Sequence, residues 1–228
     1  MTIPLTKYGL PQVAVFPAIL IAAMTAGLFI PVSILMLVLI ELVLAIVLVW
    51  GFSFFRDPLR ISPPDKNLLL SPADGTVSDI EIVKNEYVGQ NCLKIGIFLS
   101  IFNVHINRAP CDVKVEEIIY KKGKYKNALN PDSSRVNESN DLWLTATSSP
   151  NDKLIVRQIS GAIARRIVCK TVRGQKIASG EKFGMIKFGS RTELYLPAGD
   201  SRICLVKIGD KVKAGLTPLI RYQNEKIS

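Results

Sequence analysis

The sequence predicts a mostly β, barrel-sandwich-like domain that follows an N-terminal transmembrane or membrane-inserted helical hairpin. Residues 1–55 hold only two charged side chains, Lys7 and Glu41, so the remainder of the 228-residue chain carries the whole net charge of +10. After Phe55 the apolar runs become short and are separated by Gly, Pro, Asp and Asn, a pattern typical of many short strands. We therefore expect a membrane-anchoring hairpin at 1–55 and a β domain at 56–228, which is long enough to bury its own core.

The apolar head is long enough for two helices. Gly27 and Pro31 divide it into segments of roughly 13–29 and 32–52. At 1.5 Å per residue each segment reaches about 25–30 Å, close to the ~30 Å hydrocarbon core of a bilayer. The run is too long for the apolar core of a signal peptide. Two spans joined by a tight turn return both ends to one side, although a shallow hairpin that dips into one leaflet stays open.

Positive charges flank the head. Lys7 precedes the first segment, and Arg56, Arg60 and Lys66 follow the second. The positive-inside rule then places both ends, and the β domain, on the cytoplasmic side of the cell membrane. The same cations would also attract an anionic lipid surface, and the sequence does not separate these two explanations.

The β domain is predicted from a series of short apolar runs. They lie at Leu68 to Leu70, Cys92 to Phe102, Val113 to Tyr120, Leu142 to Thr147, Leu154 to Ile159, Ile163 to Val172, Phe183 to Phe188, Glu193 to Leu196, Ile203 to Ile208 and Thr217 to Tyr222. The polar segment 121–140 between them is predicted to be a long loop, and such loops are often functional lids. Residues 174–180 and 209–215 both read G-x-K-[I/V]-x-x-G, which is typical of turns in lipoyl-type barrel-sandwich domains and is informative about fold only.

The cysteines argue against a metal or disulfide framework. Cys92, Cys111, Cys169 and Cys204 are widely spaced, without a CxxC pair, and the chain has a single histidine. Zinc sites need clustered Cys and His ligands, so we expect no metal and four reduced, structural thiols.

Three residues could carry chemistry. His105 is the only histidine, and therefore the only imidazole that could act as a base near neutral pH, although a histidine in an apolar strand is more often a packed core residue. Asp74 could orient His105, or simply form the Asp-Gly turn with Gly75. Ser190 follows Gly189 and would by default mark a bend, because the G-x-S-x-G elbow of a hydrolase is missing.

Four segments in one order give these residues a context. They read FFRDP at 54–58, SPADG at 71–75, FNVHINR at 102–108 and EKFGMIKFGSR at 181–191. From about Phe54 to Tyr222 the chain resembles the phosphatidylserine decarboxylase proenzyme family in its short form, which includes archaetidylserine decarboxylases. The long enzymes of that family carry Leu-Gly-Ser-Thr at the cleavage point, whereas this chain has Phe-Gly-Ser-Arg.

The resemblance implies a self-processing enzyme. Ser190 would attack the carbonyl of Gly189, and the chain would split into a large β chain, 1–189, and a small α chain, 190–228, that stay together as a non-covalent heterodimer. Ser190 would become a covalent pyruvoyl group that forms a Schiff base with the substrate, so that neither pyridoxal phosphate nor a metal is needed. His105 would move protons, and Asp74 would hold its imidazole.

The implied reaction converts phosphatidylserine to phosphatidylethanolamine and CO2. The basic balance of the β domain fits such an anionic aminophospholipid at a membrane, and the exact lipid stays open. Nucleic acid is not an expected partner, because the sequence has no aromatic-basic RNA motif and no helix-turn-helix pattern.

Two other functions use the same residues differently. The first is a membrane-anchored Ser-His-Asp hydrolase, which would remain one uncut chain of about 25 kDa on a denaturing gel. The second is a non-enzymatic membrane adaptor built on a barrel-sandwich domain, whose function would survive the change His105→Ala.

Overall fold

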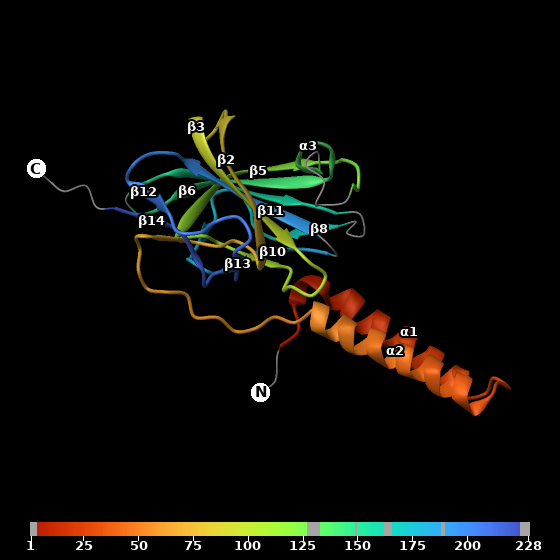
Figure 1. The fold of residues 1–228 in the computed structure, drawn as a ribbon. Coiled ribbons are helices and arrows are strands. Elements are labelled where there is room, and N and C mark those ends of the chain that lie inside the picture. The colour runs from red at the N-terminus through yellow and green to blue at the C-terminus, as the bar shows by residue number, and fades with distance from the viewer. Residues whose placement is uncertain (1–3, 127–132, 149, 162–165, 188–189, 224–228) are drawn as a thin grey trace, which may run out of the picture. The chain divides into compact units, whose positions relative to one another are not determined.

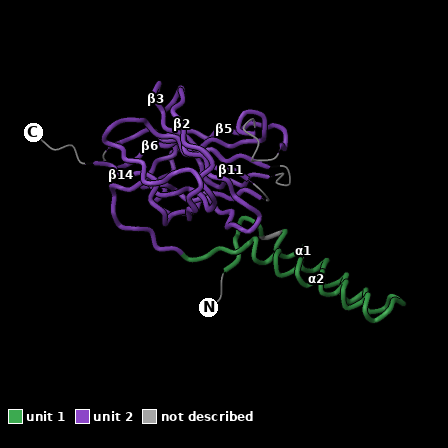
Figure 2. The backbone as a smooth tube through the Cα atoms, in the orientation of Figure 1, with its two compact units in different colours: residues 1–59 green, residues 60–228 purple. Residues whose placement is uncertain are grey.

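The computed structural model describes residues 4–126, 133–148, 150–161, 166–187 and 190–223. The chain divides into two compact units, residues 1–59 and residues 60–228 (Figure 2). Each unit is described by itself.

The first unit is a helical hairpin. A short 3-10 helix, η1 (Lys7–Gly9), leads into α1 (Leu10–Gly27), and α2 (Ile34–Phe54) runs back beside it. The base of the hairpin is closed by backbone hydrogen bonds from Thr6 N to Phe55 O (2.9 Å) and from Asp57 N to Pro4 O (2.7 Å). The two ends of the hairpin therefore lie together, as expected for two helical segments joined by a tight turn.

The second helix is the stronger membrane candidate. By length and composition α2 can cross a bilayer, whereas the apolar part of α1, Gln12–Gly27, is shorter. Many large apolar side chains of α2 are more than half exposed within this structure. A membrane anchor at the N-terminus is thus available to the protein.

The second unit is built from antiparallel strands. They are β1 (Leu68–Leu70), β2 (Gly75–Asn85), β3 (Gly89–Leu99), β4 (Ile106–Arg108), β5 (Val113–Lys121), β6 (Ser139–Ala146), β7 (Lys153–Ile159), β8 (Ile167–Cys169), β9 (Lys176–Ile177), β10 (Lys182–Ile186), β11 (Ser190–Pro197), β12 (Arg202–Cys204), β13 (Lys211–Val212) and β14 (Pro218–Tyr222), with one short helix, α3 (Ser133–Val136). The predicted mostly β class is confirmed.

The strands form one large curled sheet and two small ones (Figure 1). The large sheet has the order β13-β2-β3-β11-β7-β6-β5-β9, and the small sheets have the orders β1-β14-β12 and β4-β10-β8. Strand β11 lies inside the large sheet and pairs with β3 on one side and β7 on the other. The strand that begins at Ser190 is therefore held along both edges.

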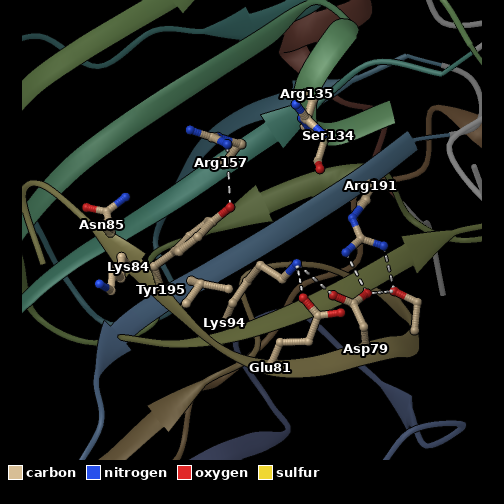
Figure 3. Close-up of a pocket in the computed structure, with 12 residues that line it drawn as sticks. Asp79, Glu81, Lys84, Asn85, Lys94, Ser134, Arg135, Arg157, Arg191 and Tyr195 are labelled. Carbon is tan, nitrogen blue, oxygen red and sulfur yellow. Dashed lines mark hydrogen bonds and ion pairs between the residues drawn. The ribbon is translucent and has the colours of Figure 1, made fainter. Parts of the chain in front are cut away.

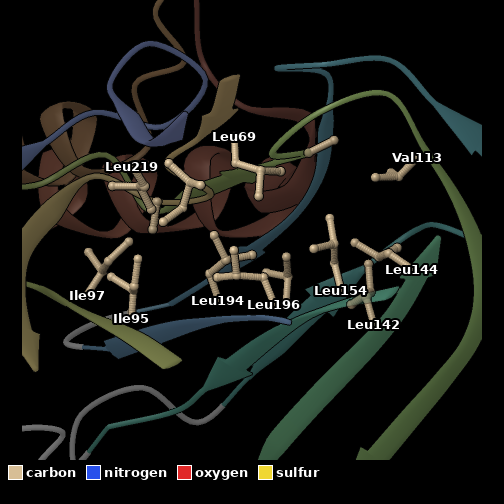
Figure 4. Packing of buried hydrophobic residues seen from close by; sticks show 14 of the residues in the cluster. Leu69, Ile95, Ile97, Val113, Leu142, Leu144, Leu154, Leu194, Leu196 and Leu219 are labelled. Atoms are coloured by element: carbon tan, nitrogen blue, oxygen red, sulfur yellow. The ribbon is translucent and has the colours of Figure 1, made fainter. Parts of the chain in front are cut away.

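One apolar cluster fills the space between the large sheet and the β1-β14 pair (Figure 4). Ile95, Ile97 and Leu194 point from the large sheet toward Leu69 and Leu219 (Figure 4). These side chains are completely buried, and each such aliphatic side chain contributes about 1.5–3 kcal/mol to the free energy of folding. Residues on both sides of position 190 thus share one core.

Some strand predictions needed correction. Strand β2 was missed, because its apolar alternation is interrupted by a register shift between Val77 and Asp79 and its outer positions are charged. The strand predicted for Ile203 to Ile208 is shorter, and the predicted loop 121–140 contains α3. The ends of two predicted strands, Ile163 and Phe188, lie outside the described residues.

Each of the four cysteines is a free thiol, in agreement with the sequence. Burial raises the pKa of the Cys92 thiol to about 11 and, together with the charges of Asp112 and Asp152, raises that of Cys111 to about 12. Both thiols therefore stay protonated and unreactive at neutral pH, as structural cysteines do.

We expect the β domain to fold without the hairpin. A chain from which residues 1–52 are removed should be soluble and should give a cooperative unfolding transition, because residues 60–228 form a compact unit with its own core. Circular dichroism and thermal unfolding would measure this. A fragment that stays unfolded and insoluble in every buffer tried would contradict the division of the chain into an anchor and a domain.

Candidate active site

Ser190 is placed at the first residue of β11. It pairs with Leu99 on β3, and its side chain is completely buried. Its Oγ has no hydrogen-bond partner among the described residues. A buried hydroxyl without a partner costs free energy, so this position is a candidate for function. Gly189, the other residue of the predicted cleavage site, lies outside the described residues.

His105 lies next to a strand pair that precedes Ser190 in the chain. It directly precedes β4, which pairs with β10, and its carbonyl oxygen accepts a hydrogen bond from Ile186 N at 3.1 Å. Ser190 follows Ile186 by four residues. The only histidine of the chain is thus completely buried next to the strand pair β4–β10, and β10 ends four residues before the candidate nucleophile.

The contact of the His105 ring fixes its tautomer. Nδ1 lies 2.9 Å from the carbonyl oxygen of Asn103. A carbonyl oxygen can only accept, so Nδ1 carries the proton, and in the neutral ring the lone pair is on Nε2. Nε2 is therefore the nitrogen that can take a proton from a hydroxyl group.

A buried amide connects the histidine segment to the serine strand. Asn107 Nδ2 donates to Thr192 Oγ1 (3.0 Å) and to the carbonyl oxygen of Pro72 (3.2 Å). Asn107 lies two residues after His105, and Thr192 lies two residues after Ser190, so each pair shares one face of its strand. Gln158 Nε2 donates to Asn107 Oδ1 at 2.9 Å and holds the amide in place. Sequence analysis missed Asn107, since a single amide carries no motif beyond its position in FNVHINR.

The predicted pairing of Asp74 with His105 stays a prediction, and the contacts described for Asp74 are made with two other residues. Within the described part of the chain, the Asp74 carboxylate is bound by both terminal nitrogens of Arg60 (2.5 and 2.8 Å) and by the backbone N–H of Ala214 (2.8 Å). The planar guanidinium matches a carboxylate better than an imidazole does, because it donates two parallel hydrogen bonds. The carbonyl of Asn103 is the contact described for His105 Nδ1.

The same ion pair changes the interpretation of Arg60. Its side chain is only 6% exposed, so it is not a free cation at the membrane surface. Lys66 remains exposed and available for that role. Asp74 nevertheless lies at the same end of the sheet as Ser190. Thr76, two residues after Asp74, pairs with Phe98 on β3, and Phe98 pairs on its other side with Arg191, the residue after Ser190.

One further buried cation lies close to Ser190 in the chain. Lys187 is 7% exposed, and its pKa lies below the ordinary value because burial and the positive charge of Arg166 both disfavour the protonated form. The sequence could have indicated this buried cation, because Lys187 interrupts the apolar run that precedes Gly189. No group of three or more His, Cys, Asp or Glu side chains in the described ranges could hold a metal ion.

A buried serine at the start of β11 and a buried histidine just before β4 make up a candidate serine–histidine site inside a mostly β domain. Comparison with known proteins shows to which family the chain belongs. A family model for phosphatidylserine decarboxylase matches residues 49–219. The chain belongs to the phosphatidylserine decarboxylase family.

Individual relatives agree over most of the chain. A phosphatidylserine decarboxylase proenzyme from Pelagibacter ubique (strain HTCC1062) is 44% identical over 187 residues, which cover 80% of this chain and 83% of the relative. The proenzyme from Desulfotalea psychrophila is 46% identical over 73% of this chain and 76% of its own length. That from Nitrosomonas eutropha is 42% identical over 75% and 77%. The resemblance stated from the four motifs is confirmed.

Proposed function

We propose that this chain is the proenzyme of a self-processing, pyruvoyl-dependent decarboxylase that converts phosphatidylserine to phosphatidylethanolamine and CO2. The observation that carries the proposal is Ser190, a completely buried hydroxyl without a hydrogen-bond partner among the described residues, at the start of β11 and four residues after Ile186, whose backbone N–H binds the carbonyl of the only histidine. Membership of the family, and relatives named as proenzymes, support it.

In the proposed cleavage, His105 Nε2 accepts the proton of Ser190 Oγ, and Oγ attacks the carbonyl carbon of Gly189. The peptide bond becomes an ester, and β-elimination then breaks the ester C–O bond and leaves a carboxylate on Gly189. Water replaces the nitrogen of residue 190, which leaves as ammonia. The complete burial of Ser190 and His105 favours this route, because exclusion of water suppresses simple hydrolysis of the ester.

The buried start of β11 suits the pyruvoyl group that would form there. That group would supply the electron sink that decarboxylation of an amino acid requires. His105 lies next to the strand pair that precedes the same position in the chain, so it could also hold the proton that returns to the product. Asp74 would act indirectly, since its bonds to Arg60 and Ala214 fix the segment that precedes β2.

The two chains would remain together after the cut. Residues after 190 supply β11 inside the large sheet, β13 at its edge, and β12 and β14 in a small sheet. Leu194 and Leu219 from this part are completely buried in the shared core. Ladder hydrogen bonds and apolar burial would therefore hold a non-covalent heterodimer.

The substrate would be an anionic aminophospholipid taken from the membrane. Helix α2 provides an apolar anchor, and Lys7 and Lys66 lie on either side of the hairpin in the sequence. By the positive-inside rule the β domain would lie on the cytoplasmic side of the cell membrane.

The purified protein is expected to consist of two chains, residues 1–189 and 190–228. Mass spectrometry should find the small chain lighter, by the mass of one ammonia, than a chain that starts with serine. It should resist Edman degradation and react with hydroxylamine, because its first group is a ketone and not an amine. Decarboxylation of phosphatidylserine in mixed micelles should be lost after hydroxylamine treatment.

Other outcomes favour the competing functions. A single uncut chain that cleaves esters would support the Ser-His-Asp hydrolase, and a free serine at 190 would contradict the pyruvoyl group. A whole chain without any activity would support the membrane adaptor. Parallel assays with phosphatidylserine and archaetidylserine would identify the preferred lipid.

A further inference from the structure

Arg191, the second residue after the proposed cut, is held by three side chains. Its Nε donates to Glu193 Oε1 (2.8 Å), its Nη1 to Ser78 Oγ (2.9 Å) and its Nη2 to Asp79 Oδ2 (2.5 Å). These contacts lie on the face of the large sheet opposite the apolar core, since Arg191 and Glu193 alternate with the core-facing residues of β11 (Figure 3). The Arg191 side chain is only 11% exposed.

The contact with Asp79 crosses a whole strand. Arg191 is on β11 and Asp79 is on β2, with β3 between them. On β3, Gly96 pairs with Asp79 on one side and with Glu193 on the other. A Cβ atom at Gly96 would collide with both Arg191 Nη2 and Asp79 Oδ2. The glycine thus leaves the space through which the guanidinium reaches the second strand.

The electrostatics of this cluster favour charged partners. Burial alone raises the pKa of Asp79, but hydrogen bonds from Arg191 and Ser78 and the charges of Arg191 and Lys94 outweigh burial and lower it. Lys94 adds ion pairs to Asp79 (3.3 Å) and Glu81 (2.8 Å). Arg191 is therefore bound to an ionised carboxylate at neutral pH.

We propose that Arg191 is a positioning residue that holds the cut end of the small chain, so that the group formed from Ser190 stays in place beside the His105 segment. This inference rests on the proposed self-cleavage. Before the cut, residue 190 is tethered by peptide bonds on both sides. Afterwards it is a chain end, and chain ends fray unless they are fixed.

The backbone alone gives that end limited support. Pairing with β3 begins at Ser190 itself, and pairing with β7 begins only at Arg191. A clamp on the very next side chain opposes fraying where it would start. A displacement of about 1 Å of a reacting group can cost a hundredfold in rate, so even modest fraying should be visible in turnover.

The test is the change Arg191→Met, with the extent of cleavage measured first and kcat and KM of the cleaved enzyme measured second. We expect the chain still to cut, kcat to fall about tenfold, and KM to stay within about twofold, because the clamp affects the reacting end and not lipid binding. Arg191→Lys, which keeps the charge but loses the fork, should recover part of kcat. Should Arg191→Met fail to fold, the same constants are measured on Asp79→Asn, which keeps the size of the side chain.

Arg202→Met is the matched control. Arg202, on β12 in a different sheet from Arg191, likewise donates to both oxygens of a carboxylate, Asp152 (2.8 and 2.6 Å). We expect this variant to be less stable, with kcat of the cleaved enzyme within about twofold of wild type.

Several results would overturn the inference. The first is a wild-type kcat in cleaved Arg191→Met, and the second is an equal loss of kcat in Arg202→Met. The third is an Arg191→Met chain that stays whole, because Arg191 would then be needed for the cut itself. If wild type cuts, such results overturn the clamp alone. A wild-type chain that never cuts would overturn the proposed function together with the clamp.

Discussion

A Ser190→Ala chain is expected to remain a single polypeptide with no decarboxylase activity. Alanine has no Oγ to attack Gly189, so neither the ester nor the pyruvoyl group can form. The substitution removes a hydroxyl that has no hydrogen-bond partner in the described structure, and folding should therefore be unaffected or slightly improved. A denaturing gel, mass spectrometry and a CO2-release assay would measure the effect.

Ser139→Ala is a suitable control for that experiment. Ser139 is also buried at the first residue of a strand, β6, but it is far from residue 190 in sequence. This variant should cut and decarboxylate like wild type. A Ser190→Ala protein that still splits between 189 and 190 would exclude Ser190 as the nucleophile.

The change His105→Ala should leave the precursor uncut for times many-fold longer than wild type needs. General-base catalysis contributes about 10²–10⁴ in rate, and the chain has no second histidine to replace it. His105→Gln keeps a polar side chain of similar length without a basic nitrogen, so it should fold and still fail to cut. A time course of the intact and cleaved bands after synthesis would give both rates.

Asp74→Asn should slow cleavage less than either change at His105. The Asn103 carbonyl binds His105 Nδ1, and we expect Asp74 to contribute through Arg60 and the segment that this ion pair anchors. Normal processing in His105→Gln would remove the histidine from the mechanism. A larger loss in Asp74→Asn than in His105→Ala would instead give the carboxylate the leading role.

The sequence predicted the fold where apolar residues alternate without interruption. Strands β5 and β7 follow the predicted ranges closely. Strand β2 was missed because a bulge breaks its alternation and because its polar positions belong to ion pairs that only the folded sheet brings together. Alternation of apolar and polar residues identifies a strand with one buried face. It does not identify a strand such as β2, whose outer face is charged and partly buried.

The sequence predicted which residues are candidates for the site, but it did not predict the contacts between them. His105 could be named because it is the only histidine, whereas Ser190 could be named only through the family resemblance of four segments in one order. The partner of Asp74 could not be predicted, since Arg60 lies in a linker that the sequence suggested would face the membrane. Asn107 and Gly96 gave no signal, because their roles consist of contacts between strands that are distant in sequence.

The position of β11 inside the large sheet has a consequence for the order of events in the life of the protein. In the proposed mature enzyme, the small chain fills the middle of a sheet whose other strands all come from the large chain, apart from β13 at one edge. If the two chains separated, β11 would have to insert again between β3 and β7. That reaction is bimolecular, and the exposed edges of β3 and β7 could meanwhile aggregate. Correct folding therefore has to precede maturation. Only correctly folded precursors would then be cleaved. Once cleaved, an enzyme that unfolds would not refold, so its unfolding would be irreversible.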